Sequence, residues 1–450
     1  MNNGTICRTN GSPKKYFLHE RTKRFSPIPR DILGPMRFLV LVLTWFCMTL
    51  TAWSAEPLIE LARAKSASTE LRDAIVSRMD ATALEGGTAY VAEGGNFLFA
   101  VRSRTEPVLY VNGLRRNPMR KLPGVDLWAS LESLPTGTSH KFEYEIDGKW
   151  TGGRSDIPAY LPECYEQAGV PQGKLSEKLI HTSQIYNGTV SEYWIYVPAQ
   201  YQADKPAALM VWHDGHNHIR RDGSARTLNV IDNLIHQGKM PVSIHVFISP
   251  GMQGERRMRS IQYDTVDDTY ARFLRDEILR EVEAKYNIRK DAYSRAISGA
   301  SSGAICAFNV AWQQPDQFSR VHSLIGSYTS IQWRPGQLEG GNVYPFKVRK
   351  EAKRNIRVWL QDGSDDLENA HGSWPLQNIQ MANSLKMMGY DYFLSWGNGT
   401  HNQAHGNAEL PRALTWLWRD YNPNRTEQTY VQDEAEKAKP YWRVTGLNRD

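Results

Sequence analysis

Hydrophobic and polar residues change their spacing along this chain, and each change predicts a different kind of structure. Residues 56–84 carry leucines and an isoleucine at helical spacing, which predicts a helical segment. From residue 85 to about residue 157, short runs of period two alternate with turn signals such as Asn112-Gly113 and Asp147-Gly148. This second pattern predicts a small all-β sandwich over residues 85–157.

The second half of the chain alternates strand-length apolar runs with helical segments. Residues 158–178 are rich in proline and glycine and are interpreted as a linker. Strands are then predicted at residues 193–197, 207–212 and 244–248, and helices at residues 270–286, 304–313, 376–388 and 410–418. This alternation predicts an α/β domain over residues 179–424, with a mostly parallel sheet covered on both faces. Residues 425–450 are polar and are expected to form a loosely held tail.

One stretch near the N-terminus is strongly apolar. Residues 38–55 contain no charged side chain, follow Arg37 and end in Ala-Trp-Ser-Ala. The pattern is typical of a secretory signal with cleavage after Ser54 or Ala55, and an uncleaved anchor is the alternative. Residues 1–55 are therefore interpreted as leader and signal, with the true start at Met36. We expect an exported protein, periplasmic or secreted, with no stable membrane insertion after cleavage.

The leader also accounts for the basic balance of the chain. The full sequence has 54 Lys and Arg against 48 Asp and Glu, but residues 1–37 hold eight of the basic and two of the acidic residues. The remainder is neutral, so the charge gives no reason to expect nucleic acid as a partner. Beyond the leader only Cys164 and Cys306 remain, too few for a disulfide framework. No C-x-x-C or H-E-x-x-H pattern appears, so a structural zinc site is not predicted, and no cofactor is expected.

The pentapeptide Gly299-Ala-Ser-Ser-Gly303 carries the clearest chemical signal in the chain. It fits G-x-S-x-G, in which a buried strand turns sharply into a helix and exposes one serine at the apex. A strand-like run precedes the motif and a helix-like run follows it, which is the context that the motif requires. Ser301 is therefore the candidate nucleophile.

A serine nucleophile needs a histidine to take its proton and a carboxylate to orient that histidine. The acid is expected after the strand at residues 356–360, where the Gly-x-x-Asp turn favours Asp366, with Asp362 and Asp365 as alternatives. The base is expected after the strand at residues 390–396. His401 comes first in that loop and is preferred to His405.

Two backbone N–H groups are needed to stabilise the oxyanion that forms when the serine attacks. One is expected from Ser302, directly after the nucleophile, and the other from His216, in the loop after the strand that ends at Trp212. The spacing of His213, His216 and His218 leaves a metal site as a weaker alternative.

These motifs resemble those of an esterase family of α/β-hydrolases that includes enterochelin, feruloyl and acetyl-xylan esterases and S-formylglutathione hydrolase. The likeness covers residues 191–420 and is carried by His213-Asp-Gly215, the Gly299–Gly303 motif, Gln361-Asp-Gly363 and Gly399-Thr-His401. The sandwich is similar to the early-set, immunoglobulin-like module that precedes some of these enzymes. Thr400 and Ala304 stand where many relatives have glycine, which removes no reacting group.

The resemblance implies a serine carboxylic-ester hydrolase acting on a small-molecule or glycan ester. Arg257 and Arg259 are candidates to bind an anionic substrate, with a solvated loop as the alternative. Asp214 and His405 are also expected to contact substrate. A polysaccharide side-chain esterase and a non-catalytic binding protein on the same scaffold remain alternatives, because fold does not fix function.

Overall fold

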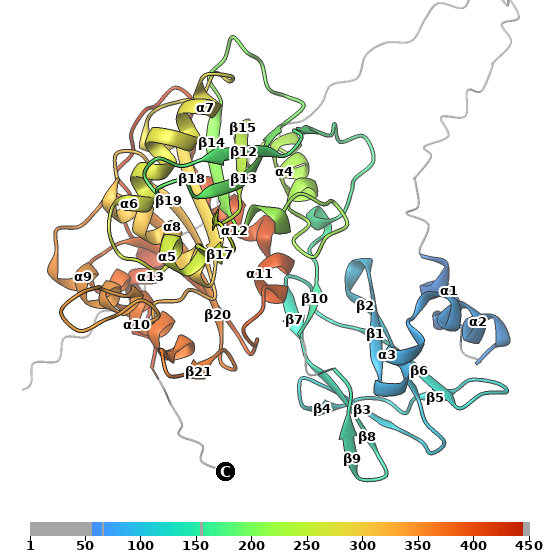
Figure 1. Cartoon of the computed structure of the whole chain (residues 1–450). Helices are drawn as coiled ribbons and strands as arrows, with labels where there is room; N and C mark the ends of the chain where they lie inside the picture. The colour runs from blue at the N-terminus through green and yellow to red at the C-terminus, as the bar shows by residue number, and fades with distance from the viewer. Residues whose placement is uncertain (1–55, 65–66, 154–155, 444–450) are drawn as a thin grey trace, which may run out of the picture. The chain divides into compact units, whose positions relative to one another are not determined.

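The computed structural model describes residues 56–64, 67–153 and 156–443 (Figure 1). The predicted leader and signal, with Met36, lie outside the described residues. The described chain begins with three short helices, α1 (Pro57–Arg63), α2 (Thr69–Arg78) and α3 (Ala81–Gly86). The side chains of Ser68 and Asp80 accept backbone N–H groups at the starts of α2 and α3, which fixes where these helices begin. Within the described residues, no helix is both long enough and apolar enough to cross a membrane.

The predicted β-sandwich is present as two four-stranded antiparallel sheets. One has the order β1-β2-β6-β5 and the other β4-β3-β8-β9. Phenylalanine, leucine and tyrosine side chains from both sheets form a common core that includes Phe97, Phe99, Leu109 and Tyr144. The strands are β1 (Thr88–Ala92), β2 (Asn96–Arg102), β3 (Val108–Val111), β4 (Leu114–Arg115), β5 (Arg120–Lys121), β6 (Leu127–Ser133), β8 (Phe142–Ile146) and β9 (Lys149–Thr151).

The α/β domain is built on a sheet whose strands from β15 to β23 run parallel, in the order β15-β14-β18-β19-β20-β23. Strand β13 (Val190–Val197) pairs antiparallel with β15 at one side. The parallel strands are β14 (Ala208–His213), β15 (Ser243–Ile248), β18 (Arg295–Ala300), β19 (Arg320–Leu324), β20 (Arg357–Gly363) and β23 (Asp391–Gly397). The predicted mostly parallel sheet is therefore confirmed.

Helices cover both faces of this sheet (Figure 1). One core contains side chains from α8 (Ser302–Gln313), α6 (Thr269–Arg272), α9 (Tyr344–Lys350) and α10 (Trp374–Met387). The opposite core contains side chains from α4 (Thr227–His236) and α12 (Leu410–Trp418). Burial on both faces explains why a strand such as β14 is almost wholly apolar. A π-helical segment, Phe273–Ile278, joins α6 to α7 (Leu279–Glu283) within the predicted helix at residues 270–286.

Three features differ from the sequence predictions. Strand β19 was not predicted, because its Arg320 and His322 are polar although both are buried. The predicted linker contributes two short strands, β10 (Ile157–Ala159), which pairs with β7 (Thr138–His140), and β11 (Lys174–Leu175), which pairs with β13. The tail also differs from its prediction as loosely held, because Tyr430 is buried and attaches it to the domain.

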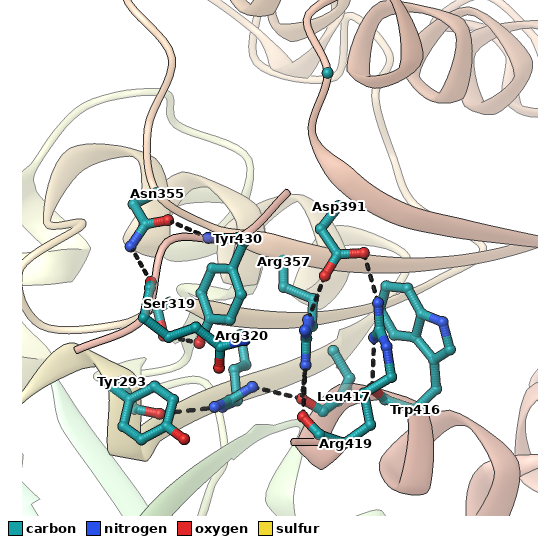
Figure 2. Close-up of polar contacts among 12 residues, drawn as sticks. Tyr293, Ser319, Arg320, Asn355, Arg357, Asp391, Trp416, Leu417, Arg419 and Tyr430 are labelled. Carbon is teal, nitrogen blue, oxygen red and sulfur yellow. Dashed lines mark hydrogen bonds and ion pairs between the residues drawn. The ribbon is translucent and has the colours of Figure 1, made fainter. Parts of the chain in front are cut away.

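Buried arginines explain how the tail is held (Figure 2). The Tyr430 ring lies 5.3 Å from the Arg320 guanidinium and 4.7 Å from that of Arg357. Its hydroxyl pairs with Ser319 at 3.0 Å. Arg357 in turn donates to Asp391 at 2.6 Å. A buried cation needs partners, and the tail supplies one of the aromatic rings that fulfil this role.

Candidate active site

Ser301 occupies the sharp turn between β18 and α8. Its backbone has φ 56° and ψ −121°, a strained conformation for a residue with a side chain. The turn brings the chain so close to itself that a Cβ at Gly299 would lie 2.1 Å from the carbonyl oxygen of Gly303. Close backbone packing therefore requires glycine at position 299, whereas a Cβ at Gly303 would lie 3.1 Å from the side chain of His213. The turn holds the serine hydroxyl at the carboxyl edge of the sheet.

The structure brings together Ser301, His401 and Asp366 from three separate loops. His401 Nε2 lies 2.9 Å from Ser301 Oγ, and His401 Nδ1 lies 2.5 Å from Asp366 Oδ1. The Asp366 side chain is completely buried, whereas the imidazole is partly exposed. The distances suit transfer of the serine proton to Nε2, with the carboxylate holding the Nδ1–H tautomer.

The two alternative acids occupy other positions. Asp362 is fully buried at the end of β20, and one of its oxygens accepts the N–H of Gly363 at 2.8 Å. Asp365 pairs with Lys141 and is more than half exposed. Neither makes a hydrogen bond with His401. Burial would raise the pKa of Asp366, but hydrogen bonds from His401 and Asp362 lower it below its ordinary value, which keeps this acid ionised.

The two expected oxyanion donors differ in their present partners. Ser302 is the first residue of α8, where backbone N–H groups have no carbonyl acceptor within the helix. The N–H of His216 points to the hydroxyl of Ser249 at 3.3 Å. The same hydroxyl lies 3.0 Å from the His216 imidazole. Donation from His216 to a substrate oxygen therefore requires the amide to exchange this long contact for a ligand.

A cavity of about 670 Å³ opens at Ser301 and His401. Its walls combine polar and apolar side chains, and they come from the segment after the sandwich, from the loop after β14 and from the His401 loop. The polar members are Asp156, Tyr160, Asn217, Ser224, Arg259, Asn402, Gln403 and Asn407. A volume of this size is in the usual range for small-molecule sites.

Of the four predicted substrate contacts, only Arg259 lines this cavity, and it is already paired. Its guanidinium makes two hydrogen bonds of 2.8 Å with Asp214, whose charge raises the arginine pKa against the effect of burial. Arg257 lies on the exposed hairpin of β16 (Met252–Gln253) and β17 (Arg256–Arg257). Because Arg259 is neutralised by Asp214, the geometry favours a positioning role over capture of an anion.

His405 is also placed away from the cavity. It is buried in α11 (Ala404–Ala408), where it packs against Gly397 and contacts the Gln361 amide at 3.4 Å. Burial lowers its pKa to about 4. His213 is likewise buried, with a pKa of about 4, and its Nδ1 lies 2.8 Å from the carbonyl oxygen of Gly303. Within the described residues, no group of three or more His, Cys, Asp or Glu is arranged to hold a metal ion.

Two residues near the reacting groups were missed from the sequence. Ser327 Oγ lies 3.2 Å from Ser301 Oγ and accepts the Trp374 indole N–H at 3.1 Å. Asp156, at the end of the predicted sandwich segment, accepts the N–H of Thr400 at 2.7 Å and the side-chain amide of Asn402 at 2.8 Å. Neither lies in a motif, so only the tertiary structure reveals them.

The fold and this constellation define an α/β-hydrolase with a serine at the nucleophile position. The chain belongs to the family described as "Putative esterase", whose model matches residues 188–417, about half of its length.

Solved structures of enterobactin esterases share the fold. The enzyme from Shigella flexneri, solved in the presence of 2,3-dihydroxy-N-benzoyl-glycine, is 17% identical with a TM-score of 0.51, over 77% of this chain and 98% of that one. The same enzyme in the presence of enterobactin is 17% identical with a TM-score of 0.51, over 79% of this chain and 99% of that one. The ferric enterobactin esterase of Salmonella typhimurium is 16% identical with a TM-score of 0.50, over 74% of this chain and 97% of that one. At this identity the likeness defines the fold of the chain, including its N-terminal module.

Proposed function

We propose that this protein is an exported serine esterase of the enterochelin-esterase type, which hydrolyses carboxylic esters through Ser301, His401 and Asp366. The observation that carries the proposal is the continuous hydrogen-bonded series from Ser301 Oγ through His401 to the buried Asp366, with spacings of 2.9 and 2.5 Å. Membership of an esterase family supports the same reaction class.

The mechanism follows from the positions of these groups. His401 Nε2 takes the hydroxyl proton as Ser301 Oγ attacks the ester carbonyl carbon, and Asp366 stabilises the imidazolium that results. The carbonyl oxygen becomes negative and accepts the Ser302 N–H and, after release from Ser249, the His216 N–H. His401 then protonates the leaving alcohol, and an acyl group remains on Ser301. Water, activated by the same imidazole, releases the acid and restores the serine.

The substrate is proposed to be a polar ester, because amide and hydroxyl side chains such as Asn217, Ser224 and Gln403 line the cavity. Catecholate siderophore esters are the first candidates, in line with the fold shared with enterobactin esterases. A glycan side-chain ester is the second, and one observation favours it. Trp150 is 57% exposed on the sandwich, with its ring 4.8 Å from that of Tyr110, an arrangement able to stack on a sugar.

The test is hydrolysis of p-nitrophenyl acetate, a siderophore ester, and feruloyl and acetyl glycans by the native chain and by Ser301→Ala. The variant should lose at least about 10³-fold in kcat with every ester that the native chain cleaves. A Ser301→Ala protein that keeps most of its activity would reject the proposed nucleophile. Absence of both turnover and fluorophosphonate labelling in the folded native chain would instead favour the binding-protein alternative.

Export is proposed from the sequence of residues 1–55 alone. Mass spectrometry of the mature protein from its native host should find an N-terminus at Ala55 or Glu56. A precursor peptide from residues 1–35 would contradict the start at Met36, and a mature protein that retains residues 38–54 would support the anchor.

A further inference from the structure

A second buried carboxyl group lies beside the acid of the triad. Asp362 is the penultimate residue of β20, and its side chain is inaccessible to solvent. Its Oδ1 accepts the Gly363 N–H at 2.8 Å. Its Oδ2 is buried and has no hydrogen-bond donor among the described residues. An orphaned carboxylate oxygen in such a position is costly, and it requires an explanation.

Asp366 presents the matching oxygen. Its Oδ1 already accepts the Leu367 N–H at 2.5 Å and faces His401 Nδ1 at 2.5 Å. Its Oδ2 is buried and also lacks a donor. Asp366 follows Asp362 across a tight turn, in which the Asp366 N–H donates to the Gly363 carbonyl at 3.3 Å. A hydrogen bond between the two carboxyl groups contributes to the pKa shifts of both. Two ionised carboxylates in contact inside a protein repel, whereas one shared proton satisfies both orphaned oxygens.

We propose that Asp362 is protonated in the resting protein and donates its hydroxyl hydrogen to Asp366 Oδ2, so that Asp362 is a positioning residue for the triad acid. This inference rests on the proposed function of Ser301, His401 and Asp366. The donated hydrogen bond fixes the Asp366 carboxylate with Oδ1 directed at His401. It also keeps the charge of the pair at one, so that the imidazolium formed during proton transfer faces a single, ordered carboxylate.

The surroundings of Asp362 agree with a neutral side chain. From α10, the amide of Asn378 faces the group, and from β23 its register partner is Trp396; neither carries a charge. Lys141 pairs with Asp365 and not with Asp362. Burial raises the pKa of Asp362 well above its ordinary value, and the hydrogen bond to Asp366 and the charge of Asp366 raise it further, which outweighs the lowering by hydrogen bonds from Gly363 and Asn378.

Infrared spectroscopy measures this proton directly, without turnover. The protein is labelled with ¹³C at the aspartate carboxyl groups, in the Ser301→Ala background, and studied at about pH 8, above the pKa of about 6 that burial gives Asp264. Aspartate-specific labelling excludes Glu409, whose pKa burial also raises. A ¹³C-shifted C=O band of a protonated carboxylic acid should appear, disappear in Asp362→Asn and remain in the exposed control Asp365→Asn. Absence of the band in the parent protein would overturn the proposal.

Kinetics then test the positioning role. The amide of Asp362→Asn retains both hydrogen bonds, one to each neighbour, so kcat should stay within about threefold of the native value, while Asp362→Ala should lower kcat by about 10- to 100-fold with little change in KM. Because the proposal gives Asp362 no charge, Asp362→Asn should leave the acid limb of the kcat/KM profile where it is. A shift of that limb to lower pH, or equal losses in both variants, would contradict the proposal. Retained activity in Ser301→Ala would reject the proposed function and leave the infrared result valid.

Discussion

Asp156 accepts two hydrogen bonds from Thr400, one from its backbone N–H at 2.7 Å and one from its hydroxyl at 3.1 Å. Thr400 immediately precedes His401, so a carboxylate from the segment that follows the sandwich fixes the loop that carries the proposed base. A third bond to the same oxygen comes from Asn402 on the other side of the histidine. The segment at residues 156–160 is therefore part of the site as well as a connection.

Removing this carboxylate should loosen the His401 loop. Asp156→Ala is expected to lower kcat by about 10-fold or more, because small displacements of a catalytic group are costly. Asp156→Asn keeps one acceptor oxygen and should retain more activity than the alanine variant. Steady-state kinetics with a p-nitrophenyl ester give the comparison, and Asp222→Ala, an exposed aspartate paired with Arg220, serves as the control. Native kcat in Asp156→Ala would show that the loop holds its own conformation.

The sharp turn at Ser301 predicts that glycine variants differ in stability in a definite order. An alanine Cβ at Gly299 would lie 2.1 Å from a backbone oxygen, whereas the nearest atom to a Cβ at Gly303 is 3.1 Å away, on the side chain of His213. Gly299→Ala should therefore cost about 3 kcal/mol or more in the free energy of unfolding, and Gly303→Ala clearly less. Gly86→Ala is a matched control, because nothing lies within 4 Å of its Cβ. Urea unfolding tests the order, which equal losses at Gly299 and Gly86 would contradict.

Asp264 is expected to make the free energy of unfolding depend on pH, and the direction follows from its pKa. Burial raises its pKa from 3.8 to about 6, although hydrogen bonds from Ser302 and from the Ser260 hydroxyl, which lies 2.8 Å away, act in the opposite direction. The native state thus holds this proton more tightly than the unfolded chain, so the contribution of Asp264 is most favourable below about pH 4 and is lost as the pH rises through about 6. At 1.36 kcal/mol for each pKa unit, the rise from 3.8 to about 6 changes the free energy of unfolding by about 3 kcal/mol.

Asp264→Asn should therefore gain stability relative to the native protein as the pH rises from about 4 to about 7. Denaturant unfolding of both proteins across this range measures the difference, and Asp268→Asn, at an exposed position, controls for the loss of one negative charge. A difference that stays constant with pH would show that Asp264 is ionised at little cost in the native state.

The attachment of the tail at Tyr430 predicts a graded loss of stability. Tyr430→Phe removes the hydrogen bond to Ser319 and should cost about 1 kcal/mol. Tyr430→Ala also removes the ring that packs on Arg320 and Arg357 and should cost about 3 kcal/mol or more. Calorimetric unfolding should place the midpoints in the order native, phenylalanine, alanine. A Tyr430→Ala protein with native stability would mean that the tail is held without contributing to the fold.

The sequence predicted those parts of the molecule in which local chemistry and tertiary structure agree. The apolar strand β14 (Ala208–His213) and the strained motif at Ser301 both have sequence patterns that are compatible with few other local structures. Strand β19 was missed because the partners that make Arg320 tolerable, including Tyr293 and Trp418, come from distant parts of the chain. The same reason hid Asp156, since its hydrogen bonds span more than 240 residues.

The candidate site divides in the same way. Ser301, Asp366 and His401 could be chosen from turn motifs and chain order, and the structure brings these three together. The roles of the charged residues could not be predicted from turn motifs or chain order. An arginine in a loop has the same sequence pattern whether it binds a substrate or pairs with an internal carboxylate, as Arg259 does with Asp214. Pairing within the fold decides between these outcomes, and it depends on residues 45 positions apart.

The central claim is that the Ser301 hydroxyl attacks the substrate, although Ser302 follows it directly and the Ser327 hydroxyl lies 3.2 Å away. Peptide mapping by mass spectrometry after reaction with a fluorophosphonate tests this claim most directly. The account predicts one adduct on Ser301, lost in Ser301→Ala and strongly slowed in His401→Ala. An adduct on Ser302 or Ser327, or labelling that persists in Ser301→Ala, would contradict it.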